Sequence, residues 1–373
     1  MDEERMEIPL HAPLEVWLAG ALMILLMAFG LWQVSYALRD TALADVPTTM
    51  EHIRSGVASD KFSKHVDMHL PARHALIATA NAGRYTIFQG TGDDVRLGRD
   101  EWLFSVEEIK YEAQSEAWMG QRLDTVARVS KLLEQKGILL VIALLPDKAR
   151  VHESQLSSAT YPVWYANRYG VALQNLRAAG VQTLDVLGVM APEATRKPLF
   201  YRTDTHWNQE GADLVAQAVA RRVRELVPDL SEVRFKTELA PSSETRVGDL
   251  LRLIGLSDVP DWFRPNPDVE RVQTTVVAGE KVQGGLLDDV TVPVVLVGTS
   301  YSRRANFHGA LQQHLSAEVL NMSKDGGGFA TSMSGYLTGE EILNSPPQVL
   351  VWEIPERVLS QPLSAVETQG WSL

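Results

Sequence analysis

The longest apolar stretch of the chain lies near its N-terminus. Residues 16–34 read VWLAGALMILLMAFGLWQV and carry no charge. At 1.5 Å per residue, a helix of this length just crosses a bilayer core of about 30 Å. Trp17 and Trp32 lie near its two ends, where tryptophans often meet the membrane interface. The pattern predicts one transmembrane helix, so that residues 1–39 form a short tail and a membrane anchor.

Two alternatives to an anchor remain for this stretch. The sequence Ala42-Leu43-Ala44 resembles a signal-peptide cleavage site, but the apolar run is long for a signal peptide and acidic residues precede it. A buried core helix is usually shorter. Charge leaves the orientation open: Arg5 precedes the span and several basic residues follow it, which would place the following part in the cytoplasm. That rule weakens when a long domain follows.

Residues 40–89 form a polar linker segment, with a helix expected over 67–82. From residue 121 onward, amphipathic helical patterns alternate with apolar runs of strand length. Continuous apolar runs are typical of strands that are buried on both faces of a parallel sheet. The expected strands are 138–145, 181–187, 292–297, 319–322 and 348–354, and the expected helices are 121–137, 164–179, 212–226 and 303–315. This alternation predicts an α/β fold, with a mainly parallel sheet between two layers of helices.

Residues 228–290 break the alternation with several prolines and short apolar pieces such as 274–277. They are expected to form an insertion over the sheet, within one domain that spans residues 90–373. The segment 248–251 is expected to return to the sheet.

Composition narrows the function. The net charge of −12 argues against nonspecific nucleic-acid binding, which relies on basic side chains. It also means that an anionic substrate would need a local basic groove. The chain has no cysteine, which excludes disulfides, thiolate metal sites and cysteine nucleophiles.

An acidic and an imidazole side chain lie two positions apart in the stretch 201–211, YRTDTHWNQEG. In an extended segment, Asp204 and His206 would project to the same side. A carboxylate beside an imidazole fixes its tautomer and stabilises its charged form. The pair therefore predicts two members of a catalytic triad that needs a nucleophile from elsewhere.

Ser300 is the candidate nucleophile, because it lies where a predicted strand becomes a helix. The N–H groups of a starting helix favour an oxyanion, and Gly298 permits the tight turn. A simple helix-capping role for Ser300 is the alternative. Together with the Asp/His pair, however, the serine completes the set that nucleophilic catalysis requires. Asn208 is expected either to cap the next helix or to support the site, and the glycine loop 326–328 offers further backbone donors.

Five short stretches stand out in order along the chain: WLF at 102–104, PDKAR at 146–150, DTHWN at 204–208, GTSYS at 298–302 and WEIPER at 352–357. Together they resemble the SGNH-hydrolase-like enzymes of the alginate O-acetyltransferase type, the AlgJ/AlgX family. The serine block follows the Asp/His block, the reverse of the usual SGNH order, and this permutation is itself a mark of the family. The single N-terminal span, with no separate carbohydrate-binding module visible after the domain, is more similar to the AlgJ side.

The resemblance implies a circularly permuted SGNH-hydrolase-like three-layer α/β/α fold with Asp204, His206 and Ser300 as the catalytic residues. Two further groups of residues are assigned around them. The first group, expected to form the oxyanion site or support it, contains Tyr301, Asn208, Gly327 and Arg202. The second group, expected to bind substrate, contains Trp207, Trp102 and Lys148.

The activity implied by the resemblance is transfer of acetyl groups, through a Ser300 acyl-enzyme, to an exopolysaccharide such as alginate or cellulose. The acetyl donor would be a membrane-bound O-acyltransferase (MBOAT) partner in the inner membrane, working with other exopolysaccharide-machinery proteins. The catalytic domain would be periplasmic and residues 1–13 cytoplasmic, and neither metal nor cofactor is expected. The alternatives are a carbohydrate acetylesterase with the same triad and a non-catalytic scaffold of a secretion complex.

Overall fold

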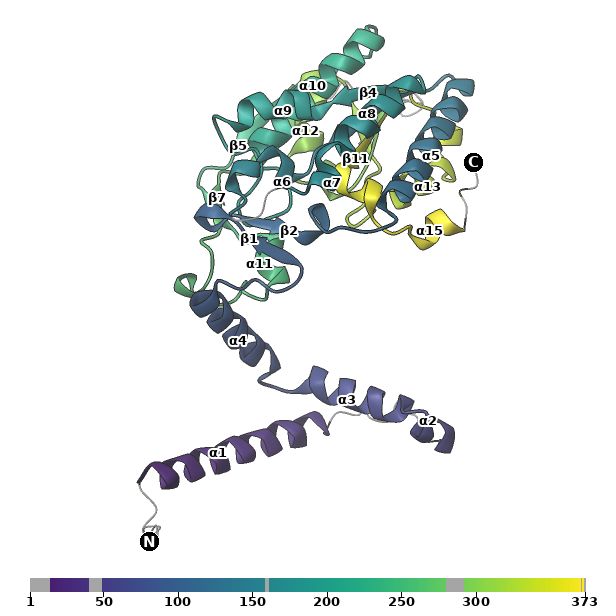
Figure 1. Ribbon diagram of the computed structural model, residues 1–373. Coiled ribbons are helices and arrows are strands. Elements are labelled where there is room, and N and C mark those ends of the chain that lie inside the picture. The colour runs from purple at the N-terminus through teal and green to yellow at the C-terminus, as the bar shows by residue number, and fades with distance from the viewer. Residues whose placement is uncertain (1–13, 40–48, 158–160, 280–291, 370, 372–373) are drawn as a thin grey trace, which may run out of the picture. The chain divides into compact units, whose positions relative to one another are not determined.

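The computed structural model describes residues 14–39, 49–157, 161–279, 292–369 and 371. The chain divides into two compact units, residues 1–82 and 83–373. The predicted tail at 1–13 and the cleavage-like sequence at 42–44 lie outside the described residues, as does the end of the predicted insertion. Figure 1 shows the elements of both units.

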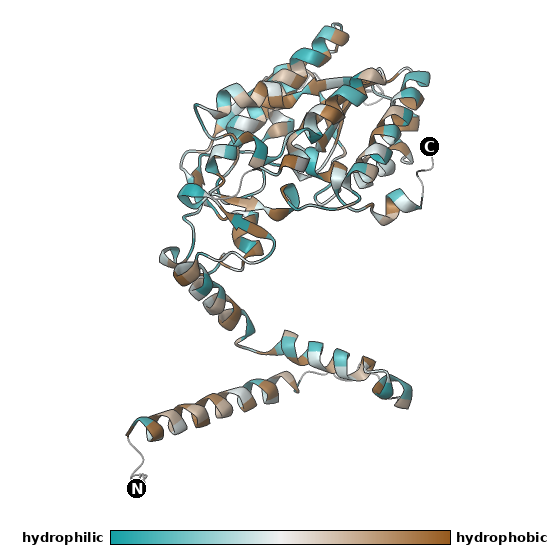
Figure 2. Ribbon diagram, viewed as in Figure 1, coloured by the Kyte–Doolittle hydropathy of each residue, from teal (hydrophilic) through white to brown (hydrophobic). Residues whose placement is uncertain are grey.

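The first unit is entirely helical in its described part. Helix α1 (Leu14–Ala37) has 24 residues and a mean hydropathy of 2.1, and Figure 2 shows it as apolar along most of its length. Among the described residues, it is the one helix that is long and apolar enough to cross a membrane. After α2 (Met50–Arg54), α3 (Val57–His69) and α4 (Arg73–Phe88) replace the single helix expected at 67–82. The break falls at Pro71, whose ring and missing N–H interrupt a helix.

The second unit is built on a five-stranded parallel sheet with the order β10-β9-β11-β3-β4. The strands are β3 (Leu139–Leu145), β4 (Gln182–Asp185), β9 (Val294–Val297), β10 (Val319–Asn321) and β11 (Val349–Pro355). Each expected strand is present, and the apolar side chains of β3, β9 and β11 pack on both faces of the sheet. All strands are parallel, so their carboxyl ends lie along one edge.

Helices cover both faces of this sheet and confirm the three-layer α/β/α architecture (Figure 1). One face packs against α6 (Lys148–Val151), α9 (Val186–Ala194), α10 (Gln209–Leu226) and α12 (Phe307–Leu315). The other packs against α5 (Ser115–Gln135), α8 (Arg168–Ala178) and α13 (Thr331–Leu337). The shorter helices are α7 (Val163–Ala166), α14 (Glu341–Asn344) and α15 (Ala365–Thr368).

Small antiparallel sheets lie outside the central one. Strands β1 (Val95–Leu97) and β2 (Leu103–Ser105) form a pair just before α5. In the described part of the predicted insertion, β5 (Phe235–Leu239) pairs with β8 (Gln273–Val277). Likewise, β6 (Glu244–Arg246) pairs with β7 (Asp268–Glu270), and α11 (Asp249–Leu253) lies between them in sequence.

Three sequence expectations on elements need correction. Residues 248–251 do not return to the sheet, since Asp249 begins helix α11. The strand expected at 181–187 ends at Asp185, whose side chain accepts from Gly188 N–H and so caps α9, a helix that the pattern did not predict. The helix expected at 303–315 begins only at Phe307, because residues 300–303 form a 3₁₀ turn.

Candidate active site

Asp204 and His206 lie on a short loop before α10, residues 201–206, which we call the acid loop. An isolated bridge between Phe200 and Trp207 closes the loop, together with a hydrogen bond of 3.1 Å from Tyr201 N–H to the His206 carbonyl. Within the loop, Asp204 Oδ1 accepts from the backbone N–H of His206 at 3.0 Å. This local turn brings the carboxylate to the imidazole, although only Thr205 separates the two residues.

The acid loop and the loop after β9 bring the three predicted catalytic residues together. His206 Nδ1 lies 2.6 Å from Asp204 Oδ1, and His206 Nε2 lies 2.7 Å from Ser300 Oγ. An ionised carboxylate only accepts hydrogen bonds, so Nδ1 carries the proton and Nε2 is left to accept from the serine hydroxyl. Asp204 and His206 are buried, whereas Ser300 is half-buried. The arrangement has the geometry of a Ser-His-Asp triad.

Asp204 is ionised because donors surround it. Burial by itself would raise the pKa of Asp204, but the hydrogen bonds from the His206 ring and backbone and the charge of Arg246 outweigh burial and hold the pKa well below its usual range. Its Oδ2 accepts from Asp249 N–H at 3.2 Å and lies 3.4 Å from Arg246 Nη2. Both donors come from the region predicted as an insertion.

The serine turn depends on Gly298 and on a buried carboxylate. Glu353 on β11 accepts from Thr299 N–H at 2.8 Å and from Ser302 Oγ at 3.1 Å, which fixes the turn on both sides of Ser300. A Cβ at position 298 would lie 2.5 Å from a Glu353 oxygen, so only glycine fits there. Burial raises the pKa of Glu353, although the hydrogen bonds from residues 299 and 302 oppose the rise. The glutamate of the WEIPER stretch, Glu353, thus has a structural role: it holds the turn that carries Ser300.

Tyr301 supports the acid loop through its side chain. Its Oη donates to the Thr205 carbonyl at 2.6 Å and accepts from Arg357 at 3.1 Å. Its ring lies 4.8 Å from the His206 ring, centre to centre. The backbone N–H of Tyr301 donates to Thr299 Oγ1 at 3.3 Å. The phenol therefore supports the site, and an oxyanion role of the backbone stays a prediction.

The other residues predicted to support the site have different contacts. Asn208 caps α10, since its Oδ1 accepts from Gly211 N–H at 2.9 Å. The Arg202 side chain donates to the Asn266 carbonyl at 2.8 Å and lies 3.9 Å from Glu101, so these contacts do not involve the triad. Gly327 N–H donates to the Lys324 carbonyl at 3.1 Å. An oxyanion role for Gly327 therefore stays a prediction.

Two of the three predicted substrate contacts are instead core residues. Trp207 is fully buried and packs against Tyr301 and Phe307, so it offers no surface to a sugar. Lys148 is also fully buried, and its Nζ donates to three backbone carbonyls. Their assignment to substrate binding is therefore corrected. Tryptophan and lysine are both common at binding sites. A tryptophan also fits the interior because it has only one polar atom, and a lysine fits there when its ammonium group is fully hydrogen-bonded.

Trp102 is largely buried but lines a pocket of about 660 Å³ together with Tyr201 and Arg202. Residues of the α10 N-terminus and of β7 complete the pocket, while Asp204, His206 and Ser300 lie outside its lining. Substrate binding by Trp102 stays a prediction.

Sequence reasoning missed the contribution of the insertion to the site. Thr205 N–H donates to Asp249 Oδ1 at 2.7 Å, and its hydroxyl contacts the same carboxylate. Asp249 Oδ2 also lies 3.5 Å from His206 Nδ1. A Cβ at Gly248 would lie 2.0 Å from the Thr203 carbonyl, so glycine is needed where the insertion meets the acid loop. The glycine-aspartate pair Gly248-Asp249 was the one local sequence signal that the insertion contacts the acid loop.

Asp204, His206 and Asp249 also lie close enough to hold a metal ion, since their ligand atoms are within 4.8 Å of one another. The nitrogen that faces both carboxylates is His206 Nδ1, which donates its proton to Asp204. A protonated nitrogen has no lone pair for a metal. The arrangement therefore fits a proton-transfer triad better than a metal centre.

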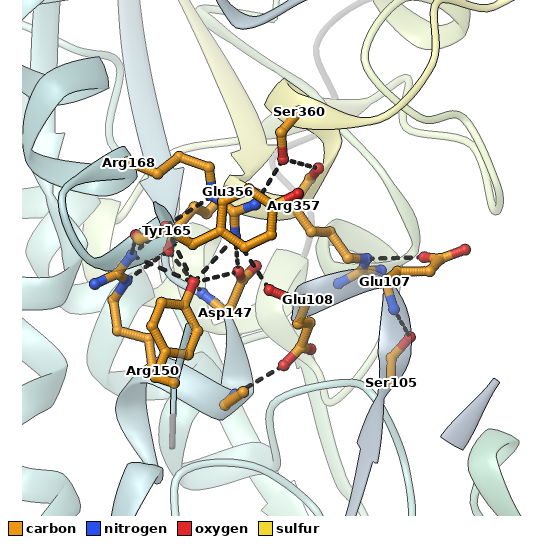
Figure 3. A network of polar contacts seen from close by, with 12 residues as sticks. Ser105, Glu107, Glu108, Asp147, Arg150, Tyr165, Arg168, Glu356, Arg357 and Ser360 are labelled. Atoms are coloured by element: carbon orange, nitrogen blue, oxygen red, sulfur yellow. Dashed lines mark hydrogen bonds and ion pairs between the residues drawn. The ribbon is translucent and has the colours of Figure 1, made fainter. Parts of the chain in front are cut away.

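A buried ion-pair network lies beside the triad at the carboxyl ends of β3 and β11 (Figure 3). Arg168 contacts Asp147 and donates to Glu356 at 3.1 Å, while Arg150 donates to Glu356 at 2.6 Å. The network joins the PDKAR and WEIPER stretches. Arg357, in the WEIPER stretch, donates to the hydroxyl of Tyr301, the side chain that supports the acid loop.

Comparison with known proteins identifies the family of the chain. A family model described as "SGNH hydrolase-like domain, acetyltransferase AlgX" matches residues 95–356. Probable alginate O-acetylase AlgJ of Pseudomonas aeruginosa is 33% identical over 362 residues, which cover 93% of this chain and 90% of that protein. Alginate biosynthesis protein AlgX of the same organism is 30% identical over 315 residues, 80% of this chain and 64% of that protein.

A solved structure gives the same result for the fold. The O-acetyltransferase domain of Pseudomonas putida AlgJ has a TM-score of 0.65 and 36% identity, and the match covers 73% of this chain and 94% of that structure. The chain therefore belongs to the AlgJ/AlgX family of SGNH hydrolase-like acetyltransferases.

Proposed function

We propose that this protein is an O-acetyltransferase that carries an acetyl group on Ser300 and transfers it to the hydroxyl groups of an exopolysaccharide, with alginate as the acceptor. The observation that carries the proposal is the hydrogen-bonded series from Asp204 through His206 to Ser300. The names of its AlgJ relatives, probable alginate O-acetylases, support both the reaction and the acceptor.

In the proposed first step, Ser300 Oγ attacks the acetyl carbonyl of the donor while His206 Nε2 takes the hydroxyl proton. Asp204 then stabilises the imidazolium. When the tetrahedral intermediate collapses, His206 returns the proton to the leaving group and the acetyl ester remains on Ser300. The backbone N–H of Ser300 itself would stabilise the oxyanion, since the N–H groups of Thr299 and Tyr301 donate to Glu353 and to Thr299 Oγ1.

In the second step, a sugar hydroxyl attacks the acetyl ester and His206 accepts its proton. Collapse of the second intermediate gives the acetylated sugar, and the proton passes from His206 to Ser300 Oγ. The serine is thereby regenerated, so two transfers use one nucleophile and one base.

Two arginines near Ser300 support a carboxylated acceptor rather than a neutral one. The side chains of Arg303 and Arg304 are 51% and 41% exposed. Both pair loosely with Asp325, at 3.8 Å and 3.3 Å. In a chain of net charge −12, this local positive charge is where a polyuronate would bind best.

We also propose that α1 anchors the protein in the inner membrane and that the second unit is periplasmic. The length and hydropathy of α1 support the anchor. A membrane-bound O-acyltransferase partner would supply the acetyl group to Ser300, alongside other proteins of the exopolysaccharide machinery. No metal or cofactor is assigned a part in either step.

The test uses the full-length protein with p-nitrophenyl acetate as donor and an alginate oligosaccharide as acceptor. Ser300→Ala, His206→Ala and Asp204→Ala should each lose acetyl transfer by at least about 10³-fold, because the three residues act as a unit. Mass spectrometry should find an acetyl adduct on Ser300 of the unmodified protein. The exposed Ser242→Ala variant serves as the matched control and should retain full activity.

Two results would contradict the proposal. Undiminished acetylation by the Ser300→Ala protein would exclude Ser300 as the carrier of the acetyl group. Ser300-dependent release of free acetate, without any acetylated oligosaccharide, would identify an acetylesterase instead.

A further inference from the structure

Lys148 is a buried cation that the proposed reaction does not use. We propose that Lys148 is a positioning residue, whose ammonium group holds the acid loop in the conformation that directs Asp204 at His206. This inference rests on the proposed function, because such positioning affects chemistry only if the triad is catalytic. Lys148 lies at the start of α6, directly after strand β3, and so comes from the sheet edge on which the site is built.

The contacts of Lys148 match its donors one for one. Its Nζ donates to the carbonyls of Leu103 at 2.6 Å, Arg202 at 3.0 Å and Asp204 at 2.9 Å. An ammonium group has three N–H donors and no acceptor, so these three carbonyls use all of them. Two of the carbonyls belong to the acid loop, on either side of Thr203. Lys148 therefore fixes two peptide groups of the loop at one point.

The N–H groups of the same loop are held by carboxylates from the insertion. Asp268 accepts from Arg202 N–H at 2.8 Å and from Thr203 N–H at 3.0 Å, and Asp249 accepts from Thr205 N–H. The loop thus lies between a cation that binds its carbonyls and anions that bind its N–H groups. Loss of the cation would free the carbonyls of the loop, while the carboxylates would still hold its N–H groups.

The surroundings of Lys148 make a neutral replacement informative. The side chain is fully buried, and its Nζ lies 5.2 Å from the ring centres of both Trp102 and Phe104. A charge in such a place is costly unless its hydrogen bonds are complete. Methionine would fill similar volume but would leave three buried carbonyls without the donor. The Asp204 peptide would then be free to rotate, and the carboxylate would move with it.

The protonation of Lys148 provides a second readout. Burial lowers the pKa of Lys148 to about 8, against the opposing charges of Glu108, Asp268, Asp204 and Asp249. The nearby His152 is kept neutral, because burial and the charge of Lys148 lower its pKa to about 4. A neutral amine has only two N–H donors, so one carbonyl loses its partner when Lys148 deprotonates. Activity should therefore fall as the pH rises through about 8.

The experiment measures hydrolysis of p-nitrophenyl acetate by the full-length protein, with Ser300→Ala as the reference for triad-dependent activity. Lys148→Met should lower kcat roughly 100-fold, the scale expected for a misplaced catalytic group, and leave KM unchanged because Lys148 does not touch substrate. Lys131→Met, which removes an exposed lysine on α5, is the matched control and should change neither. Thermal unfolding verifies that each variant is folded.

Lys148→Arg keeps the charge, since guanidinium does not deprotonate in proteins. This variant should retain more activity than Lys148→Met and should lose the decline in kcat near pH 8. If Lys148→Met does not fold, the pH profile of kcat for Lys148→Arg tests the inference by itself. A decline in kcat of Lys148→Arg at the same pH as in the unmodified protein would overturn the inference.

The outcomes separate this inference from the proposed function. A Lys148→Met protein with unchanged kcat, in a reaction that Ser300→Ala abolishes, would overturn the positioning role only. Hydrolysis and polymer acetylation that both persist in Ser300→Ala would overturn the proposed function, and the positioning role with it.

Discussion

Arg303 and Arg304 follow the proposed nucleophile, Ser300, after two intervening residues, although the chain as a whole is acidic. Exposed charges contribute modestly to affinity, but they act on orientation and on encounter with a charged ligand. A polyuronate carries a carboxylate on every sugar, so a pair of guanidinium groups beside Ser300 would hold one sugar in register with the acetyl ester.

The double variant Arg303→Gln/Arg304→Gln should raise KM for an alginate oligosaccharide about tenfold, which corresponds to ~1.4 kcal/mol. Hydrolysis of p-nitrophenyl acetate should stay unchanged, because that ester carries no carboxylate. The control is Arg221→Gln, an exposed arginine on α10. The difference in KM between the double variant and the unmodified protein should shrink at high salt, because salt screens exposed charges. An equal KM for both proteins at low salt would contradict a role in acceptor binding.

Single residues also show which parts of the site could be predicted. Asp204, His206 and Ser300 are predicted from local patterns, a D-x-H pair and a serine after a buried strand, and the structure brings the three side chains into contact. Trp207 and Lys148 were misassigned because a tryptophan or lysine beside a motif has the same sequence signature whether it faces a ligand or the core. The burial of a side chain depends on which distant segments pack against it, here β2, α12 and the 3₁₀ turn after Ser300.

At the scale of elements, the insertion is part of the candidate active site. Strands β6 and β7 and helix α11 supply Arg246, Asp249 and Asp268, each of which contacts the acid loop. The triad therefore depends on a segment that contributes no strand to the central sheet.

Arg246→Met should make the activity more sensitive to acid. The folded pKa of Asp204 is depressed, so its contribution to stability is present above the unfolded value of about 3.9 and is lost as the pH falls through the folded pKa. Without Arg246 the folded pKa rises towards the unfolded value, so Asp204 contributes less stability and becomes protonated in the folded protein at higher pH. The thermal midpoint at pH 7 should therefore be lower than in the unmodified protein, and kcat, measured from pH 7 down to pH 3, should decline earlier.

Lys236→Met is the matched control for this experiment, because it removes an exposed cation of β5 whose carboxylate partner, Glu238, is itself exposed to solvent. Its acid profile should follow the unmodified protein. Superimposable profiles for Arg246→Met and the control would show that Arg246 does not act on Asp204.

The elements of the central sheet were predictable for a physical reason, and those of the insertion were not. Strands such as β3 and β11 are buried on both faces, so their sequences are continuous apolar runs with a clear length. The insertion strands are partly exposed and three to five residues long, which leaves little pattern. Helix α9 was missed because it begins one residue after β4 and carries Pro192, so that strand and helix read as one segment followed by a break.

At the scale of the whole molecule, α1 and the second unit have separate proposed roles. If α1 is an anchor as proposed, the full-length protein should stay in the membrane fraction after washing with alkaline carbonate, whereas a chain that lacks residues 1–37 should be released. Both proteins should hydrolyse p-nitrophenyl acetate, which shows that the second unit is folded in each. Release of the intact full-length protein by carbonate would contradict the anchor. An intact mass that begins after residue 44 would instead reveal a cleaved signal peptide.

The strand order has a consequence for when the proposed activity can begin. Strand β11 is the last of the described sheet in sequence, yet it lies at the centre, between β9 and β3. It also brings Glu353, which fixes the serine turn. Strand β3 therefore pairs with a strand that lies some two hundred residues later in the chain, and contacts of such long range form slowly. In a protein exported as proposed, the turn that holds Ser300 would gain its support only after the last strand has crossed the membrane, so we expect a partly exported chain to be inactive.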